Sequence, residues 1–261
     1  MTYIPNRDFL IEVQKGNVAG HALVHKFGAN RDVDTGTSPE DVWTPGGLMI
    51  HQIAADTLDI VSASANDDGN PTTNTGAQTV TIEGLDASFD LQTETVTMNG
   101  VTTVVSVNSY IRVFRAFAAT VGTYHGNNEG AIDIIYNGTT DQAAQIILGK
   151  GQTEMTHYTV PNAKTGYLLS ALLHVKGTIG INAGEADFTL YMVPSADDVS
   201  QPFGGAKRVV QNFEGIQGSV AFVPRSPIRF EGKTDIWFDV DNPAANDTAV
   251  EIDYELLLVD D

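Results

Sequence analysis

From Ile50 onward the sequence is a series of short runs rich in Val, Ile, Thr, Tyr and Phe, separated by clusters of Gly, Asn, Asp and Pro. The final run has an apolar side chain at every second position: Val250, Ile252, Tyr254, Leu256 and Leu258. Successive side chains of a β-strand point to opposite faces, so this period predicts a long strand with one buried and one wetter face. Because such runs recur and long helical patterns do not, we expect an all-β fold, a jelly-roll-like antiparallel β-sandwich with an extended N-terminal arm.

The composition of the runs predicts about fourteen strands, because β-branched and aromatic residues favour the pleated backbone. The expected strands are 57–62, 79–84, 94–98, 110–120, 131–136, 144–148, 155–160, 166–175, 186–193, 209–213, 220–223, 228–230, 235–240 and 249–259. Asn99-Gly100 is the strongest hairpin signal, since both residues tolerate the positive φ angles of a type I′ turn. We therefore expect the run 94–98 to pair with 101–105.

The first 47 residues differ from the rest in composition and in the pattern of their apolar residues. A short apolar segment at 8–13 is followed by scattered glycines and the polar run 30–39, and Pro45, Gly46 and Gly47 close the segment. Residues 20–27 have the length of two helical turns, which are marginal without tertiary partners. These features predict a docking arm at 1–47 and one β-sandwich body at 48–261, with a subdivision near Lys150-Gly151 left open.

The chain has 33 acidic and 14 basic residues, a formal net charge of −19, and no cysteine. The excess of negative charge opposes binding to the phosphate backbone of nucleic acid. The lack of cysteine excludes disulfides and thiolate metal sites. No window approaches the ~18 uninterrupted apolar residues of a membrane-spanning helix, and Met1–Phe9 lacks the apolar core of a secretory signal. We therefore expect neither a nucleic acid nor a membrane as partner.

Motifs that carry catalysis are absent from the sequence. It contains neither the G-x-S-x-G turn of serine hydrolases nor a complete phosphate-binding loop. Acidic residues are plentiful, but their number does not identify two carboxylates that face each other across a cleft. We therefore expect no enzymatic activity and no cofactor.

Two patterns in the sequence contain side chains that bind metal ions. His21 and His25 would share one face of a helix, where His51 or an aspartate would supply a third ligand. The acidic loops 32–37 and 239–247 offer carboxylates for calcium, although the first has Trp43 where an EF-hand has its last glutamate. Polar residues of a docking arm and solvated turns are the favoured interpretations, so no metal site is predicted.

Apolar side chains of the arm are the expected partner-binding residues: Phe9, Leu10, Ile11, Val13, Phe27 and Trp43. Trp43 has two alternative roles, as an anchor in a neighbour's pocket or as an anchor against its own body. A second set, the cations, are candidates for contacts with acidic groups of other subunits: Arg112, Arg115, Lys207, Arg208 and Arg229. Exposed ion pairs contribute little each, so ordinary surface charge is the alternative.

Several longer segments carry a further signal. They include Phe9-Leu-Ile-Glu-Val-x-x-Gly-Asn-Val-x-Gly-His21, Val24-x-Lys-Phe-Gly28, Asp32-Val-Asp34, Glu40-Asp-Val-Trp43, Ala55-Asp-Thr-Leu-Asp-Ile-Val-Ser62, Thr79-Val-Thr-Ile-Glu-Gly-Leu-Asp86, Glu94-Thr-Val-Thr-Met-Asn-Gly100 and Leu256-Leu-Leu-Val-Asp-Asp261. Together they span most of the chain. With these segments the sequence resembles uncharacterised structural proteins encoded by marine tailed bacteriophages and cyanophages.

The resemblance implies a β-rich component of the virion, present in many copies and without catalytic residues. It is consistent with a capsid decoration or cement protein that uses the arm to bind the major capsid protein or other virion proteins. A homotrimer is the oligomer that the resemblance suggests. The alternative is a tail-associated or head-fibre protein that presents the loops 67–76 and 126–130 to a host receptor.

Overall fold

The computed structural model of the chain describes residues 8–36, 39–70, 72–176 and 184–261. Its elements are α1 (Phe9–Gln14), β1 (His21–Val33), β2 (Glu40–Asp41), β3 (Leu58–Ser62), β4 (Ala77–Leu85), β5 (Leu91–Thr97), β6 (Val104–Val105), β7 (Arg112–Val121), β8 (Ile132–Tyr136), β9 (Gln142–Ile146), β10 (Tyr158–Thr159), β11 (Lys164–Lys176), β12 (Glu185–Val193), β13 (Arg208–Phe222), β14 (Ile228–Phe230), β15 (Asp235–Asp241) and β16 (Thr248–Asp260). All strand pairs in these ranges are antiparallel, so the all-β prediction is confirmed. In the described part of the chain, no helix is long and apolar enough to cross a membrane.

The largest sheet has nine strands and runs in the order β1-β16-β11-β13-β12-β15-β10, with β14 beside β11 and β2 beside β15. Strand β16, between β1 and β11, carries the alternation seen in the sequence. Val250, Ile252, Tyr254, Leu256 and Leu258 are all buried in the first hydrophobic core. The residues between them face outward, as the period of two predicts.

The two edges of this sheet approach each other and nearly close it into a barrel. The amide of Met155 donates to the carbonyl of Phe27 on β1 at 2.9 Å, and the amide of Thr156 donates to the carbonyl of Val42 at 3.0 Å. Val42 in turn donates to the carbonyl of Phe238 on β15 at 2.9 Å. A Cβ at Gly28 would lie 2.5 Å from the Thr156 amide, so only glycine permits this approach. We call α1, β1, β2 and β10–β16 the barrel unit.

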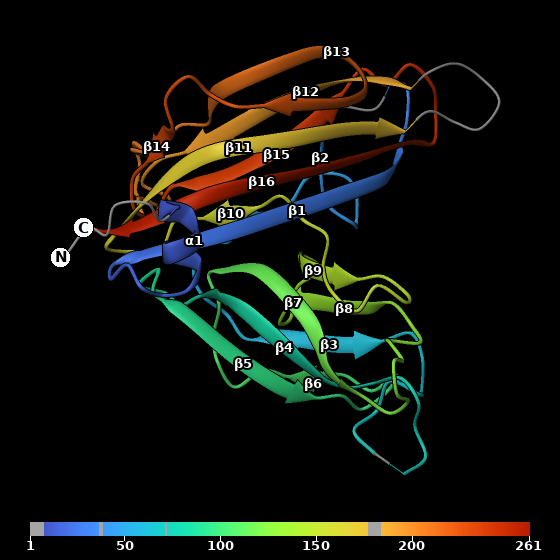
Figure 1. Ribbon diagram of the computed structural model, residues 1–261. Coiled ribbons are helices and arrows are strands. Elements are labelled where there is room, and N and C mark those ends of the chain that lie inside the picture. Colours follow the sequence, from blue (N-terminus) through green and yellow to red (C-terminus); the bar gives the residue numbers. More distant parts are fainter. Residues whose placement is uncertain (1–7, 37–38, 71, 177–183) are drawn as a thin grey trace.

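Strands β3–β9 form a second unit, inserted between β2 and β10 (Figure 1). A four-stranded sheet, β6-β3-β8-β9, and a three-stranded sheet, β5-β4-β7, enclose a second hydrophobic core. We call this the insert unit. Ile111 and Phe114 of the insert unit lie in the first core, and Lys26 on β1 donates a hydrogen bond to the carbonyl of Phe114. The two units are therefore packed against each other.

The segment that the sequence predicts as an arm is largely built into the barrel unit. Residues 21–33 form β1, which pairs with β16 from His21↔Val259 to Asn30↔Val250, and the helical turns considered for 20–27 are a strand. Pairing with β16 satisfies the backbone, and Ala29 and Val33 are buried. Residues 1–7 and 37–38 of the predicted arm lie outside the described residues.

The turn predicted at Asn99-Gly100 is present, but the predicted pairing of 94–98 with 101–105 is wrong. Gly100 has φ +58°, and the amide of Thr102 donates to the carbonyl of Asn99 at 3.0 Å. The flanking strands diverge, because β5 pairs with β4 whereas β6 pairs with β3 of the opposite sheet. The Gly100 amide donates to the carbonyl of Asp67 at 2.8 Å, so the turn is held by a neighbouring loop instead of by its own hairpin.

Candidate functional site

Helix α1 presents an apolar surface at the beginning of the described chain. The Asp8 carboxylate caps the helix by accepting hydrogen bonds from the amides of Leu10 at 3.0 Å and Ile11 at 3.3 Å. Val13 is buried, whereas Phe9, Leu10 and Ile11 are 44, 37 and 53% exposed. One side chain thus holds the helix in place and three others face outward.

A groove of about 300 Å³ lies between this helix and strands β1 and β16. It is lined by Leu10, Ile11, Gln14, Leu23, Val24, His25 and Glu255. Glu255 is the carboxylate of this lining, and Glu251 and Asp253 share the outward face of β16 with it. His25 Nε2 lies 3.8 Å from the nearer carboxylate oxygen of Asp253. The groove therefore combines apolar side chains with one carboxylate, that of Glu255.

Two residues of the predicted partner-binding set are buried in their own chain. Trp43 is 3% exposed, lies in the second core, and donates from Nε1 to the carbonyls of Gly46 at 2.9 Å and Gly47 at 3.1 Å. Trp43 therefore anchors its segment against the body of its own chain, which is the second of the two roles predicted for it. Val13 is likewise covered, and Phe27 on β1 is half-buried. The exposed part of the set is therefore Phe9, Leu10 and Ile11.

Arg112, predicted as a contact between subunits, is instead the centre of a buried ion pair. Its Nε and Nη2 donate to the two carboxylate oxygens of Asp235 at 3.0 and 2.9 Å. Nη1 donates to the carbonyls of Gln52 at 2.7 Å and Ile111 at 2.8 Å. Arg112 belongs to β7 and Asp235 to β15, so the pair joins the insert unit to the barrel unit. The position of a charge along the sequence does not reveal such burial.

The other predicted cations remain at the surface. Arg115 lies with its guanidinium carbon 4.8 Å from the ring centroid of Phe117. Arg208 is exposed at the beginning of β13. Arg229 pairs with Glu231 at 2.8 Å, and both side chains are more than half exposed. The geometry leaves these groups accessible, and their role between subunits stays a prediction.

The interface between the two units also contains a buried polar cluster that sequence reasoning missed. His157 Nε2 lies 3.2 Å from a carboxylate oxygen of Asp41, and both side chains are buried. The His51 ring packs 5.3 Å from Trp237 and 5.6 Å from His157, and its burial lowers its pKa to about 4. Asp41 and His157 are more than a hundred residues apart in the sequence, so no local motif indicates the cluster.

The alternative of a metal site at His21 and His25 is not supported by their positions. His21 and His25 lie on the same strand, where four residues span about 13 Å, too far to share one ion. His21 Nδ1 is instead 2.9 Å from the carbonyl of Ala19. The i, i+4 argument fails because the segment is a strand and not a helix.

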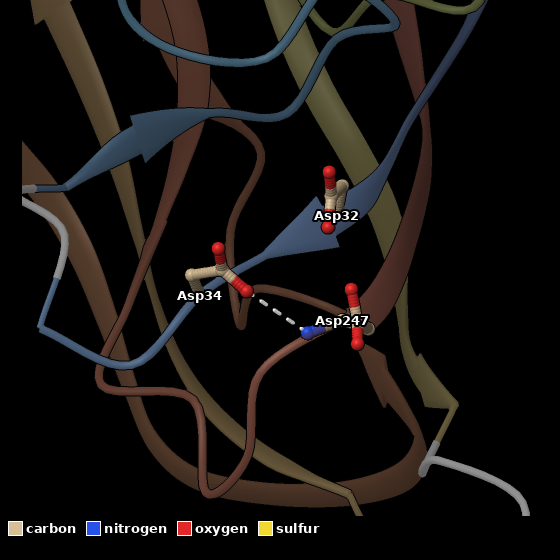
Figure 2. A group of neighbouring side chains, drawn as sticks. All are labelled: Asp32, Asp34 and Asp247. Atoms are coloured by element: carbon tan, nitrogen blue, oxygen red, sulfur yellow. Dashed lines mark hydrogen bonds between the residues drawn. The ribbon is translucent and has the colours of Figure 1, made fainter.

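The two acidic loops considered for calcium meet in space (Figure 2). Asp32 and Asp34 at the end of β1 lie beside Asp247, with one carboxylate oxygen from each within 4.8 Å of the others. The Asp247 amide donates to Asp34 Oδ1 at 3.1 Å. A hydrogen bond with Asp247 and the nearby charge of Asp34 raise the pKa of Asp32. Asp32 and Asp247 are exposed, so the cluster is a surface turn with closely spaced carboxylates.

The loops predicted to face a receptor also come together, at the end of the insert unit. Asp67 is fully buried and accepts hydrogen bonds from the amides of Ala77 at 2.7 Å, Glu129 at 2.8 Å and Gly130 at 2.9 Å, and from Ser62 Oγ at 2.5 Å. Nearby, Tyr124 is 88% exposed, with its ring centroid 4.0 Å from that of His125. We call this surface, residues 62–76 and 122–130 as far as they are described, the tip.

Comparison with known proteins finds no matching family and no matching curated sequence. Among solved structures, the chain is similar to the infectious bursal disease virus Gx strain structure at 9% identity and a TM-score of 0.24, covering 92% of this chain and 70% of that one. For the VP2 subviral particle of the same virus, the values are 9% identity, a TM-score of 0.23, and 92% and 72% coverage. This is a weak structural similarity to a viral capsid protein, and TM-scores this low carry no argument about function.

Proposed function

We propose that this chain is a structural protein of a tailed-phage virion, a capsid decoration or cement protein that binds the head shell and stabilises it. In this proposal the protein is a homotrimer in the virion, binds the major capsid protein or another virion protein, and catalyses no reaction. Its sequence resemblance to structural proteins of marine tailed phages supports the setting. The high net negative charge supports an exposed, soluble surface component.

The observation that carries the proposal is the apolar surface of α1 beside the groove. Phe9, Leu10 and Ile11 are exposed together on a helix that is capped and anchored. Grouped apolar side chains at a protein surface mark contact sites, and water-excluding anchors contribute most of the binding energy of such contacts. The carboxylates of β16 favour a partner segment that combines apolar side chains with Lys or Arg.

The first test is the protein content of particles encoded by the genome that carries this gene. Quantitative mass spectrometry of purified particles should find the chain in many copies, and antibody labelling should place it on the head. Absence from the particles would refute the virion role. Labelling of the tail alone would refute the decoration role and leave a tail protein.

The second test asks whether α1 is the contact. Ile11→Asp places a charge at a 53% exposed position, so we expect little loss of stability and at least about tenfold weaker binding to heads, about 1.4 kcal/mol. The matched control is Val223→Asp, at a 72% exposed position after β13, which should bind like the wild type. Equal binding of both variants would contradict the proposed interface.

A second candidate function is host-receptor binding by a tail-associated or head-fibre protein, and the tip is the observation that favours it. Buried Asp67 holds two predicted receptor loops together, and Tyr124 stands exposed beside them. Purified protein should then adsorb to host cells and compete with infection, and Tyr124→Ala should weaken both effects. Failure of the wild-type protein to adsorb would rule this candidate out.

A further inference from the structure

Lys207, just before β13, reaches across the outer face of the large sheet. On β15 the side chains of Ile236, Phe238 and Val240 enter the first core, so Trp237 and Asp239 lie on the opposite face. Lys207 Nζ lies 3.6 Å from the ring centroid of Tyr191 on β12 and 5.1 Å from that of Trp237. Past these rings, Nζ is 3.7 Å from Asp239 Oδ2. The aromatic faces therefore hold the amine against one carboxyl group.

The Asp239 carboxyl group is buried and incompletely paired. Asp239 is 2% exposed, and its Oδ2 has no hydrogen-bond partner among the described residues. The 3.7 Å to Lys207 exceeds the length of an N–H···O hydrogen bond. Burial, together with the charges of Asp41 and Asp241 and against that of Lys207, raises the pKa of Asp239 to about 7. A large fraction of this group is therefore a neutral carboxylic acid near neutral pH, the form that an amine attacks most readily.

Asp41 lies directly opposite Asp239 in the β2–β15 pair. Opposed side chains in an antiparallel pair lie about 5 Å apart at Cβ. Burial alone would raise the pKa of Asp41. The hydrogen bonds with His157 and with the Met49 amide outweigh this effect and lower the pKa below its usual value. Asp41 Oδ1 is buried and, like Asp239 Oδ2, unpartnered within the described ranges. The pair thus combines a carboxylate and a carboxylic acid, the arrangement of a proton acceptor beside a proton donor.

We propose that Lys207 and Asp239 form an intramolecular isopeptide bond. The lone pair of the neutral Lys207 Nζ attacks Cγ of protonated Asp239 and becomes the new C–N bond. The Asp41 carboxylate accepts the proton that the amine loses and returns it to the departing hydroxyl group, which leaves as water. One amide and one water are formed, and no oxidant or cofactor is consumed. The contact between the two groups favours this step, because groups held in contact react at a high effective concentration.

The bond has a structural consequence for the barrel unit. It ties the beginning of β13 to β15 across β12, next to the edge where β2 and residues 155–157 close the sheet. A chain without cysteine has no disulfide to restrain it. An amide between strands restrains the unfolded chain by the same loop-closure effect and resists reduction. This inference is independent of the proposed virion function.

Intact mass spectrometry of the full-length protein under denaturing conditions tests the proposal. After prolonged incubation at neutral pH, we expect a mass lower than that of the sequence by one water molecule. Peptide mapping should then find a branched peptide that contains both Lys207 and Asp239. A mass equal to that of the sequence would show that the pair is an ion pair only and would overturn the proposal.

Variants assign the bond to these residues. Lys207→Arg keeps the charge over the aromatic rings but cannot form the amide, and Asp239→Ala removes the acceptor, so both should retain the full mass. The control is Lys233→Arg, at a lysine paired with Asp197 at 2.8 Å, which should still lose water. Loss of water from Lys207→Arg would place the modification elsewhere and overturn the assignment. Asp41→Asn should slow the loss of water, and an unchanged rate would refute the relay role of Asp41.

Discussion

Replacing Asp235 with Asn should destabilise the protein by about 3–5 kcal/mol, because the buried Arg112 guanidinium then lacks a counter-charge. The two side chains are 8 and 4% exposed, so water cannot replace the lost partner. Asn has nearly the volume of Asp, so no cavity adds to the cost. Thr159 Oγ1, which donates to Asp235 at 2.6 Å, keeps an acceptor when the Asn oxygen occupies that position. The substitution therefore removes the counter-charge of Arg112 together with the acceptor of its Nη2 hydrogen bond.

Urea unfolding, followed by fluorescence of the two tryptophans, measures this loss as a change in the free energy of unfolding. Arg112→Met/Asp235→Leu should recover most of the stability, since an apolar pair avoids the cost of burying an isolated charge. The matched control is Arg229→Met, which breaks the exposed pair with Glu231 and should cost less than about 1 kcal/mol.

Two results would refute this reasoning. If Asp235→Asn costs no more than the surface control, the pair does not stabilise the contact between the units. If the double variant is as unstable as the single variant, the loss comes from packing or local geometry instead of from an unpaired charge.

Three further outcomes follow from the fold. Gly28→Ala should prevent closure of the barrel unit or lower the melting temperature strongly, since its Cβ would lie 2.5 Å from backbone atoms; an unchanged melting curve would contradict this. Burial, reinforced by the charge of Arg115, lowers the pKa of Lys26 from 10.5 to about 7. The unfolded chain therefore binds more protons between these values, so stability should rise with pH from about 7 to 10.5, and Lys26→Met should flatten that rise in urea midpoints. Asp67→Ala removes the acceptor of four hydrogen bonds and should cost about 3 kcal/mol or more, with faster hydrogen exchange at the Gly130 amide; unchanged exchange would show that another contact holds the tip.

Strand character was predictable wherever one face of a strand meets a core. The alternation in 249–259 and 186–193 has a period of two because the buried side chains of β16 and β12 face the first core. The strand at residues 21–33 was not predictable, because Gly28 and the polar side chains interrupt the period of two. Gly28 is present for close backbone approach, and Lys26 is buried with its amine hydrogen-bonded to Phe114. Without knowledge of these tertiary contacts, the composition of the segment is typical of an extended arm.

The candidate sites were predictable only in part. The apolar segment at the N-terminus and the acidic loops were visible as composition, and Phe9, Leu10 and Ile11 are indeed exposed on α1. Burial of Arg112 and Trp43 was not predictable, because each depends on partners in distant parts of the chain. The pair of Asp41 and Asp239 has no signal in the sequence, since its members are opposed only through the register of β2 on β15.

The sequence by itself determined the class of the fold, its high negative charge and its lack of disulfides, because side-chain period and composition are local properties. The tertiary structure alone decided which strands pair, that the chain forms a barrel unit with an insert unit, and which charges are buried between them. Antiparallel pairing joins residues by register and not by distance along the chain. Asp32 therefore meets Asp247, Arg112 meets Asp235, and Lys207 meets Asp239 only after the sheets have formed.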